Sequence, residues 1–335
     1  MSNVPLVSVN LATVCIESFT YGVFFVLSIS SIWLLKHRHD HINKATKSAV
    51  STIYTSPMFL GAVALLTTIS AHWFLTCTRL FQAFVHFDNG TDPLLFYADL
   101  RQLTEVVKTG FLMASLVIGD AMVIYRLWTI WNHNLYVIIF PACTLVGLTV
   151  CGVGITYQFT QYTIGEDVFI SAAGRWITSD CVFTLCTNVY SSVMIAWRVW
   201  NSHRSVKSYG GGNLMKVLAT FVESAALYTS WTIFFFASYQ SHSNLQFTAV
   251  DVWPSMSGIA FMLINTRVGL GWAQTASTFS GISSIASGNN PRPEQPYPMR
   301  PLAVNITREV NKNDDRDNSI ELDKHVTRQG YIDMI

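Results

Sequence analysis

Four acidic side chains lie inside long apolar stretches of this chain, and they are the first residues that suggest chemistry. They are Glu17, Asp120, Asp180 and Glu223. An ionisable group within a membrane-spanning helix is energetically costly and usually faces other helices or a cavity. At a rise of about 1.5 Å per helical residue, Glu17 and Asp180 fall in the outer third of their stretches. Asp120 and Glu223 fall about two turns from the inner ends, so the acids form an outer pair and an inner pair.

The outer pair is placed to line a cavity open to the exterior. The carboxylates of Glu17 and Asp180 would bind a cationic or hydroxylated small molecule there, and Trp231, within an aromatic run, would form the floor. The alternative is that each carboxylate is hydrated near the lipid headgroups or hydrogen-bonded to a neighbouring helix. Trp231 would then serve only in packing or lipid contact.

The inner pair lies near two arginines and an asparagine. Asp120 precedes Arg126, and Asn265 and Arg267 lie near the inner end of the last apolar stretch. A carboxylate of Asp120 or Glu223 paired with either arginine would form an ion lock, which gives two helix packings different energies, as a switch requires. A static polar clamp and a proton relay are the alternatives. Asp120→Asn would stop a relay and leave a clamp almost intact.

Seven apolar stretches must position these side chains. A bilayer core about 30 Å thick needs roughly 20 apolar residues per helix. The stretches have no polar face for water, and they are too long and too uniformly apolar for membrane-spanning strands. We therefore expect an all-α membrane protein, with a bundle of seven transmembrane helices over residues 1–273. The stretches begin near Leu11, Ser56, Val106, Leu135, Ile177, Val217 and Thr248.

The distribution of charge predicts the orientation of the bundle. Lysine and arginine gather in the connections after the first, third and fifth stretches, and acidic residues gather in the alternate connections. Since cytoplasmic loops carry the excess of basic residues, we expect the N-terminus outside and the C-terminus in the cytoplasm. Four basic residues depart from this pattern, namely Arg79, Arg101, Lys108 and Arg175.

Two glycosylation triplets provide a test of this orientation. Asn89-Gly90-Thr91 falls in the first outer connection, and Asn305-Ile306-Thr307 falls near the C-terminus. Only a triplet on the lumenal side of the secretory membrane receives sugar. We therefore expect glycosylation at Asn89 and none at Asn305.

The composition changes at about residue 274. Ser, Gly, Asn and Pro dominate first, and mixed charges follow. Few apolar residues are present to offset the entropy lost on ordering, so we expect residues 274–335 to be a disordered cytoplasmic tail. The tail would serve as a flexible tether or be phosphorylated within the cluster from Thr275 to Ser287.

Several function classes are excluded by what the sequence contains. A formal net charge of +1 is unlike the basic surface of a nucleic-acid-binding protein. The six cysteines form no CxxC or Cys/His spacing for a metal. No HExxH or GxSxG motif occurs. We expect neither an enzyme nor a bound metal or cofactor.

Four segments carry a family resemblance, and they lie at 120–128 (DAMVIYRLW), 196–200 (AWRVW), 223–228 (ESAALY) and 264–271 (INTRVGLG). Together they resemble the expanded family of seven-helix membrane proteins of mushroom-forming (basidiomycete) fungi, over roughly Leu11 to Ala273. The resemblance implies a receptor-like seven-helix bundle and carries no established activity. The helix count and orientation also resemble those of G-protein-coupled receptors, but Tyr125, and no acid, directly precedes Arg126. The sequence therefore leaves G-protein coupling open. The last stretch has no lysine for a retinal Schiff base.

These observations predict a receptor-like sensor in the plasma membrane, with the lipid bilayer as its surroundings. Its partners would be a small-molecule ligand on the outside and a signalling partner in the cytoplasm. The alternative is a transporter or channel for a small molecule or protons, since acids at staggered depths also suit a relay.

Overall fold

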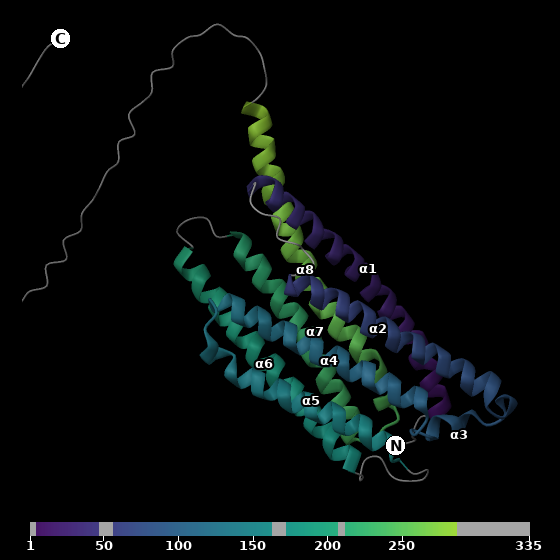
Figure 1. Ribbon diagram of the computed structural model, residues 1–335. Coiled ribbons are helices and arrows are strands. Elements are labelled where there is room, and N and C mark those ends of the chain that lie inside the picture. Colours follow the sequence, from purple (N-terminus) through teal and green to yellow (C-terminus); the bar gives the residue numbers. More distant parts are fainter. Residues whose placement is uncertain (1–4, 47–55, 163–171, 207–211, 287–335) are drawn as a thin grey trace, which may run out of the picture. The chain divides into compact units, whose positions relative to one another are not determined.

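The computed structural model describes residues 5–46, 56–162, 172–206 and 212–286, and the chain within these ranges is helical, without strands (Figure 1). Seven long helices coincide with the seven apolar stretches. Short helical turns join two pairs of them: η2 (Gln82–His86), η3 (Phe87–Gly90) and α3 (Pro93–Ala98) between α2 and α4, and η4 (Leu135–Val137) before α5. The long helices are α1 (Leu6–Thr46), α2 (Pro57–Phe81), α4 (Leu103–Ile130), α5 (Ile139–Thr160), α6 (Ala172–Val206), α7 (Gly212–Gln240) and α8 (Leu245–Ala286).

The ends of several helices follow from local sequence. Pro57 and Pro93 occupy the start of α2 and α3, where a missing N–H costs no helical hydrogen bond. The chain reverses direction after η2 through Asp88 and Asn89, both with positive φ, a conformation that these two residue types tolerate. The resulting turn exposes the Asn89 side chain.

Five helical segments are long and apolar enough to cross a membrane, and they indicate an integral membrane protein. These segments are Leu6–Asp40, Pro57–Gly90, Leu103–Ile130, Ile139–Thr160 and Leu245–Arg267. Within the described residues, helices α6 and α7 do not meet the same criterion of length and mean hydropathy. Helix α6 buries several polar side chains, among them Thr184, Thr187, Asn188 and Ser191, and these residues lower its hydropathy.

Neighbouring helices pack in chain order, and α1 closes the bundle against α8. Helix α4 contacts α2, α5, α6 and α8, so it lies at the centre of the arrangement in Figure 1. Two buried clusters fill the interior. One gathers around Leu116, Phe235 and Trp253, and the other around Phe24 and Ile69.

The closure of α1 against α8 depends on a small residue. A Cβ atom added to Gly258 would lie 2.5 Å from the ring of Phe24 and 2.7 Å from Ile69. Small residues at helix interfaces of membrane proteins let backbones approach closely. Gly258 therefore lets α8 pack against side chains of both α1 and α2.

Helix α8 continues beyond the predicted end of the bundle at residue 273. It runs to Ala286, and the chain divides into two units at this point, residues 1–286 and 287–335. The prediction of a disordered tail otherwise concerns residues 287–335, which lie outside the described part of the chain, as does Asn305.

Candidate functional site

A network of ion pairs joins α2, α4 and α8 near the end of the bundle where α4 begins. Lys108 Nζ lies 2.9 Å from Asp251 Oδ1 and 3.3 Å from Glu105 Oε2. Arg79 Nε lies 2.9 Å from the same Glu105 oxygen, and Arg79 Nη1 donates to Thr104 Oγ1 at 2.9 Å. Arg79, Lys108 and Asp251 are buried. Each buried charge therefore has an opposite charge beside it, as a low-dielectric interior requires.

The network extends to α1 through a histidine. His72 Nδ1 lies 2.9 Å from Glu17 Oε1, and His72 Nε2 lies 4.0 Å from Asp251 Oδ1. Thr76 Oγ1 donates to the same Glu17 oxygen at 3.4 Å. Only 1% of Glu17 and of His72 is exposed. Asp251 thus links the pair on α1 and α2 to the pair on α4 and α8.

The balance of charge in this network depends on His72. Its three carboxylates face two permanent cations, Arg79 and Lys108, and the imidazole of His72. A protonated His72 makes the group neutral, and a neutral His72 leaves one negative charge unmatched.

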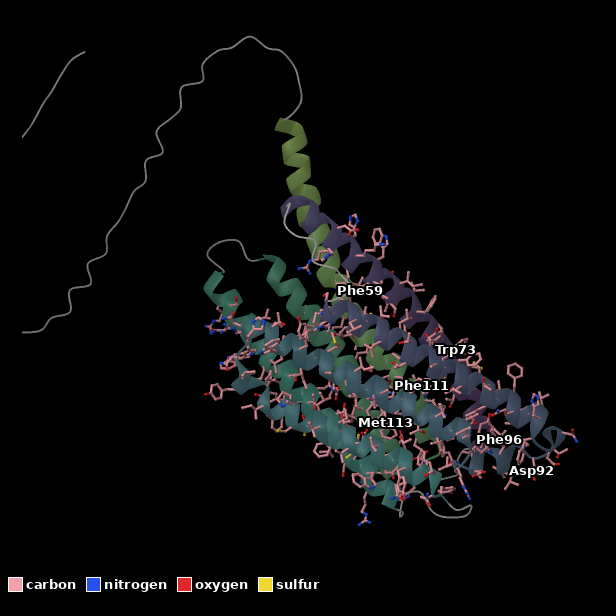
Figure 2. All side chains as sticks on the ribbon, in the orientation of Figure 1. Phe59, Trp73, Asp92, Phe96, Phe111 and Met113 are labelled. Carbon is pink, nitrogen blue, oxygen red and sulfur yellow. The ribbon has the colours of Figure 1, made fainter. Side chains whose placement is uncertain are left out.

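Helix α3 and the turns before it cover the Arg79 end of the network. The guanidinium of Arg79 lies 5.0 Å from the centre of the Phe96 ring, and Gln102 Nε2 donates to the Phe96 carbonyl at 3.2 Å. Phe96 and Tyr97 pack against Ala83. Burial raises the pKa of the Tyr97 phenol, so it stays a neutral hydroxyl. Figure 2 shows Phe96 and Asp92 together at this end, with Trp73 further back along α2.

A cavity of about 80 Å³ adjoins the network. Glu105, Lys108 and Asp251 form its charged wall, and Asp180 of α6 adds a further acidic side chain. Asp180 is buried, and its Oδ1 has no hydrogen-bond partner within the described residues. The remaining wall is mostly apolar and aromatic, including Met113, Phe159, Phe235, Phe247 and Trp253.

A proline on α8 removes one helical hydrogen bond next to this wall. Pro254 lies inside α8 and has no N–H, so the carbonyl of Val250, four residues earlier, lacks its helical hydrogen bond. Val250 lines the same cavity. Trp253, which also lines the cavity, has an Nε1 donor without a partner within the described residues. A ligand group that donates, such as an amine or a hydroxyl, can satisfy the Asp180 acceptor, and a hydroxyl can also accept from Trp253.

The structure separates the three residues predicted to form an outer ligand cavity. Asp180 lines the cavity described above, whereas Glu17 reaches it only through His72 and Asp251. Trp231 donates from Nε1 to the Ala249 carbonyl at 2.9 Å and packs against the core, and it is not among the residues that line the cavity. Their role in binding a ligand stays a prediction.

Sequence reasoning missed most of the network. Arg79, Glu105, Lys108 and Asp251 fall near the ends of apolar stretches, where charged residues are normally hydrated. His72 lies within the second stretch, but its sequence position does not indicate its partner. One feature of the sequence did indicate part of the network. Arg79 and Lys108 are two of the four basic residues that depart from the charge pattern, and the structure places both in buried ion pairs.

Two members of the predicted ion lock, Asp120 and Arg126, take neutral partners. Asp120 accepts hydrogen bonds from Thr184 Oγ1 and Asn188 Nδ2, each at 2.8 Å. Arg126 donates from Nη2 to Asn265 Oδ1 at 2.7 Å and to the Phe261 carbonyl at 3.3 Å. These hydrogen bonds connect α4 to α6 and to α8.

Two other members of the predicted ion lock, Glu223 and Arg267, lie elsewhere. Glu223 is exposed on α7, because the neighbouring positions Phe221, Ser224 and Tyr228 occupy its buried face. Arg267 is exposed, and it is the last residue of α8 whose side chain the structure describes. Asp120 and Arg126 both line a cavity of about 40 Å³ without touching each other. The ion lock therefore stays a prediction, with Arg126 and Asn265 as the members that the structure brings together.

Within the described part of the chain, no group of three or more His, Cys, Asp and Glu side chains is arranged to hold a metal ion. Comparisons with protein-family models, with curated proteins and with solved structures find no match to this chain.

Proposed function

We propose that this protein is a receptor-like membrane sensor without catalytic chemistry, and that its ligand is a small amine or alcohol. The observation that carries this proposal is the position of Asp180, whose unpartnered Oδ1 belongs to the same cavity as the Lys108–Asp251 ion pair. A ligand that donates to Asp180 would lie beside a contact that holds α4 to α8. Binding would change the strength of that contact, and a ligand that favours one helix packing shifts the population toward it.

The size and lining of the cavity narrow the ligand class. A cavity of about 80 Å³ is far below the roughly 300–1,000 Å³ of pockets for drug-sized molecules. The ligand therefore has few heavy atoms, or the cavity widens on binding. Its donor group would face Asp180 and the Val250 carbonyl, and its hydrocarbon part would contact Trp253 and Phe235.

The proposal includes seven membrane crossings, with the N-terminus outside and the C-terminus facing a cytoplasmic signalling partner, in the plasma membrane. Support for seven crossings comes from the outer faces of α6 and α7, which expose apolar side chains such as Val193 and Ile233. Exposed apolar side chains along a helix of this kind suit contact with lipid. The resemblance to the seven-helix family of mushroom-forming fungi agrees with this count.

A thermal-shift experiment on the purified full chain tests the ligand proposal. The probes are a panel of short-chain primary amines and the matching alcohols. A ligand at 100 times its Kd stabilises the folded state by about 2.7 kcal/mol. We expect Asp180→Asn to lose this stabilisation and Asp92→Asn, which changes an exposed acid at the same end, to keep it. If a ligand stabilises Asp180→Asn as much as the wild-type protein, the ligand does not bind in this cavity, and the proposal is wrong.

Proton transport is the second candidate, because Glu17, His72, Asp251, Lys108 and Glu105 form a continuous series of titratable groups. Such chains of ionisable residues mark proton pathways in membrane proteins. Proteoliposomes containing a trapped pH-sensitive dye separate the two candidates. A sensor shows no proton flux. Flux in the wild-type protein that His72→Gln abolishes would favour the transporter.

A further inference from the structure

Arg126 is a buried guanidinium with unused hydrogen-bond donors. It lies 18 residues after Lys108 on α4, about 27 Å along the helix and therefore near the opposite end of the bundle. Nη2 makes the hydrogen bonds to Asn265 and Phe261, while Nε and Nη1 have no partner within the described residues. Only 7% of Arg126 is exposed. A buried charge without a counter-ion is strongly destabilising, so these donors call for an anionic partner.

The two acids predicted to pair with Arg126 do not supply that partner. Asp120 lies six residues earlier on α4, about 9 Å along the helix axis, and hydrogen bonds from Thr184 and Asn188 occupy its oxygens. Glu223 lies on the exposed face of α7. The guanidinium therefore lies beside neutral side chains, with the centre of the Phe261 ring 4.3 Å from Arg126 Cζ.

Arg126 also lines a cavity of about 290 Å³ at this end of the bundle. The cavity wall contains a second arginine, Arg38 of α1, and the amide of Asn265. None of the described residues that line this cavity is acidic. The rest of the wall is largely apolar, including Leu34, Met58, Ile195, Val199, Phe221 and Ile264.

We propose that this cavity binds an amphipathic anion, with its carboxylate or phosphate on Arg126 and its hydrocarbon chain against the apolar wall. Hydrogen bonds between a guanidinium and such an anion are charge-assisted and about twice as strong as neutral ones. A volume of about 290 Å³ lies at the lower limit of roughly 300 Å³ for organic ligand pockets, so it suits a chain of moderate length. The anion is a free fatty acid or the head of an anionic phospholipid, and this site is distinct from the cavity beside Lys108.

Equilibrium dialysis with radiolabelled decanoate tests the site on the full chain in a neutral detergent. We expect saturable binding of decanoate and no matching binding of decanol, which has the same hydrocarbon chain without the charge. Arg126→Gln should weaken decanoate binding about 10- to 100-fold, equivalent to about 1.4–2.8 kcal/mol. Arg198→Gln is the matched control, because Arg198 is exposed and stacks on Trp131 outside the cavity.

A second variant leaves the guanidinium in place and fills the cavity. Ile264→Trp adds a bulky side chain to the wall, and we expect it to exclude decanoate while Arg126 and Asn265 remain. This variant keeps the test decisive if Arg126→Gln fails to fold. Decanoate binding that survives in Ile264→Trp, or that falls equally in Arg198→Gln, would overturn the proposal.

Native mass spectrometry identifies the source of the anion. The protein is reconstituted into nanodiscs of phosphatidylcholine alone or of phosphatidylcholine with phosphatidylglycerol, and released into the spectrometer. Retention of phosphatidylglycerol by the wild-type protein and its loss in Arg126→Gln would identify a bilayer lipid. Decanoate binding without such retention would identify a free fatty acid. Absence of both from the wild-type protein contradicts the site.

Discussion

Lys108 Nζ lies 2.9 Å from Asp251 Oδ1, and this ion pair connects α4 to α8 across 143 residues of sequence. Both side chains are buried, and both belong to the network that includes Glu105 and His72. The pair explains why a lysine occurs on the side of the membrane where the charge pattern predicts acidic residues. Its charge is neutralised inside the bundle and does not contribute to a basic loop.

Breaking this pair from either side should destabilise the bundle strongly. Asp251→Asn leaves Lys108 with only Glu105, and Lys108→Met leaves Asp251 beside His72 alone. Removing one partner of a buried pair costs about 3–5 kcal/mol, because the remaining charge is uncompensated. Thermal unfolding of each purified variant measures the loss, with the exposed-residue variant Arg175→Gln expected to stay within about 0.5 kcal/mol.

The double variant Lys108→Met with Asp251→Leu distinguishes pairing from simple burial. Two apolar side chains of similar volume often replace a buried ion pair without loss of stability. We expect the double variant to unfold at a higher temperature than either single variant. Additive losses from the two substitutions would show that the residues stabilise the bundle independently.

Gly258 should tolerate no side chain, in contrast to a glycine with open space around it. Gly258→Ala places a Cβ against Phe24 and Ile69, and overpacking of this kind costs about 1–3 kcal/mol. Gly110→Ala on α4 meets nothing within 4 Å, and alanine favours a helix over glycine by about 1 kcal/mol. Thermal unfolding should therefore show opposite signs for the two variants. Equal effects would contradict the close contact of α1 with α8.

Sugar attachment at Asn89 should report the side of the membrane on which the turn after α2 lies. The Asn89 side chain is exposed, which suits the acceptor triplet Asn89-Gly90-Thr91. After expression in a eukaryotic cell, glycosidase treatment should increase the gel mobility of the wild-type protein and have no effect on Asn89→Gln. Asn305→Gln should behave like the wild type. Sugar on Asn305 would reverse the proposed orientation.

The sequence predicts the helices of this bundle well, because each apolar stretch is long enough to specify its own element. Glu17, Asp120 and Asp180 are buried, in keeping with the general rule that an acid within a membrane-spanning helix usually faces other helices. Glu223 is exposed instead, because Phe221 and Tyr228 occupy the buried face of α7 and Glu223 lies on the opposite face.

The partners of these acids could not be predicted. Whether Glu17 meets His72, or Lys108 meets Asp251, depends on the rotation and depth of two helices that are far apart in sequence. Periodicity within one helix contains no information about the neighbour it packs against. The cavity beside Asp180 could not be predicted for the same reason, because its wall is formed by residues of α4, α5, α6, α7 and α8 together.

We propose that the ionic network lies inside a bundle that crosses the membrane seven times. Helices α6 and α7 decide this count, because they are the two long helices outside the five candidate spans. Single cysteines at positions 165, 208 and 241 test it most directly, in a variant whose six native cysteines are replaced. A membrane-impermeant maleimide added to intact cells should label Gly165→Cys and Ser241→Cys, and label Ser208→Cys only after permeabilisation. Labelling of all three positions from the same side would show that α6 and α7 do not cross, and would contradict the account.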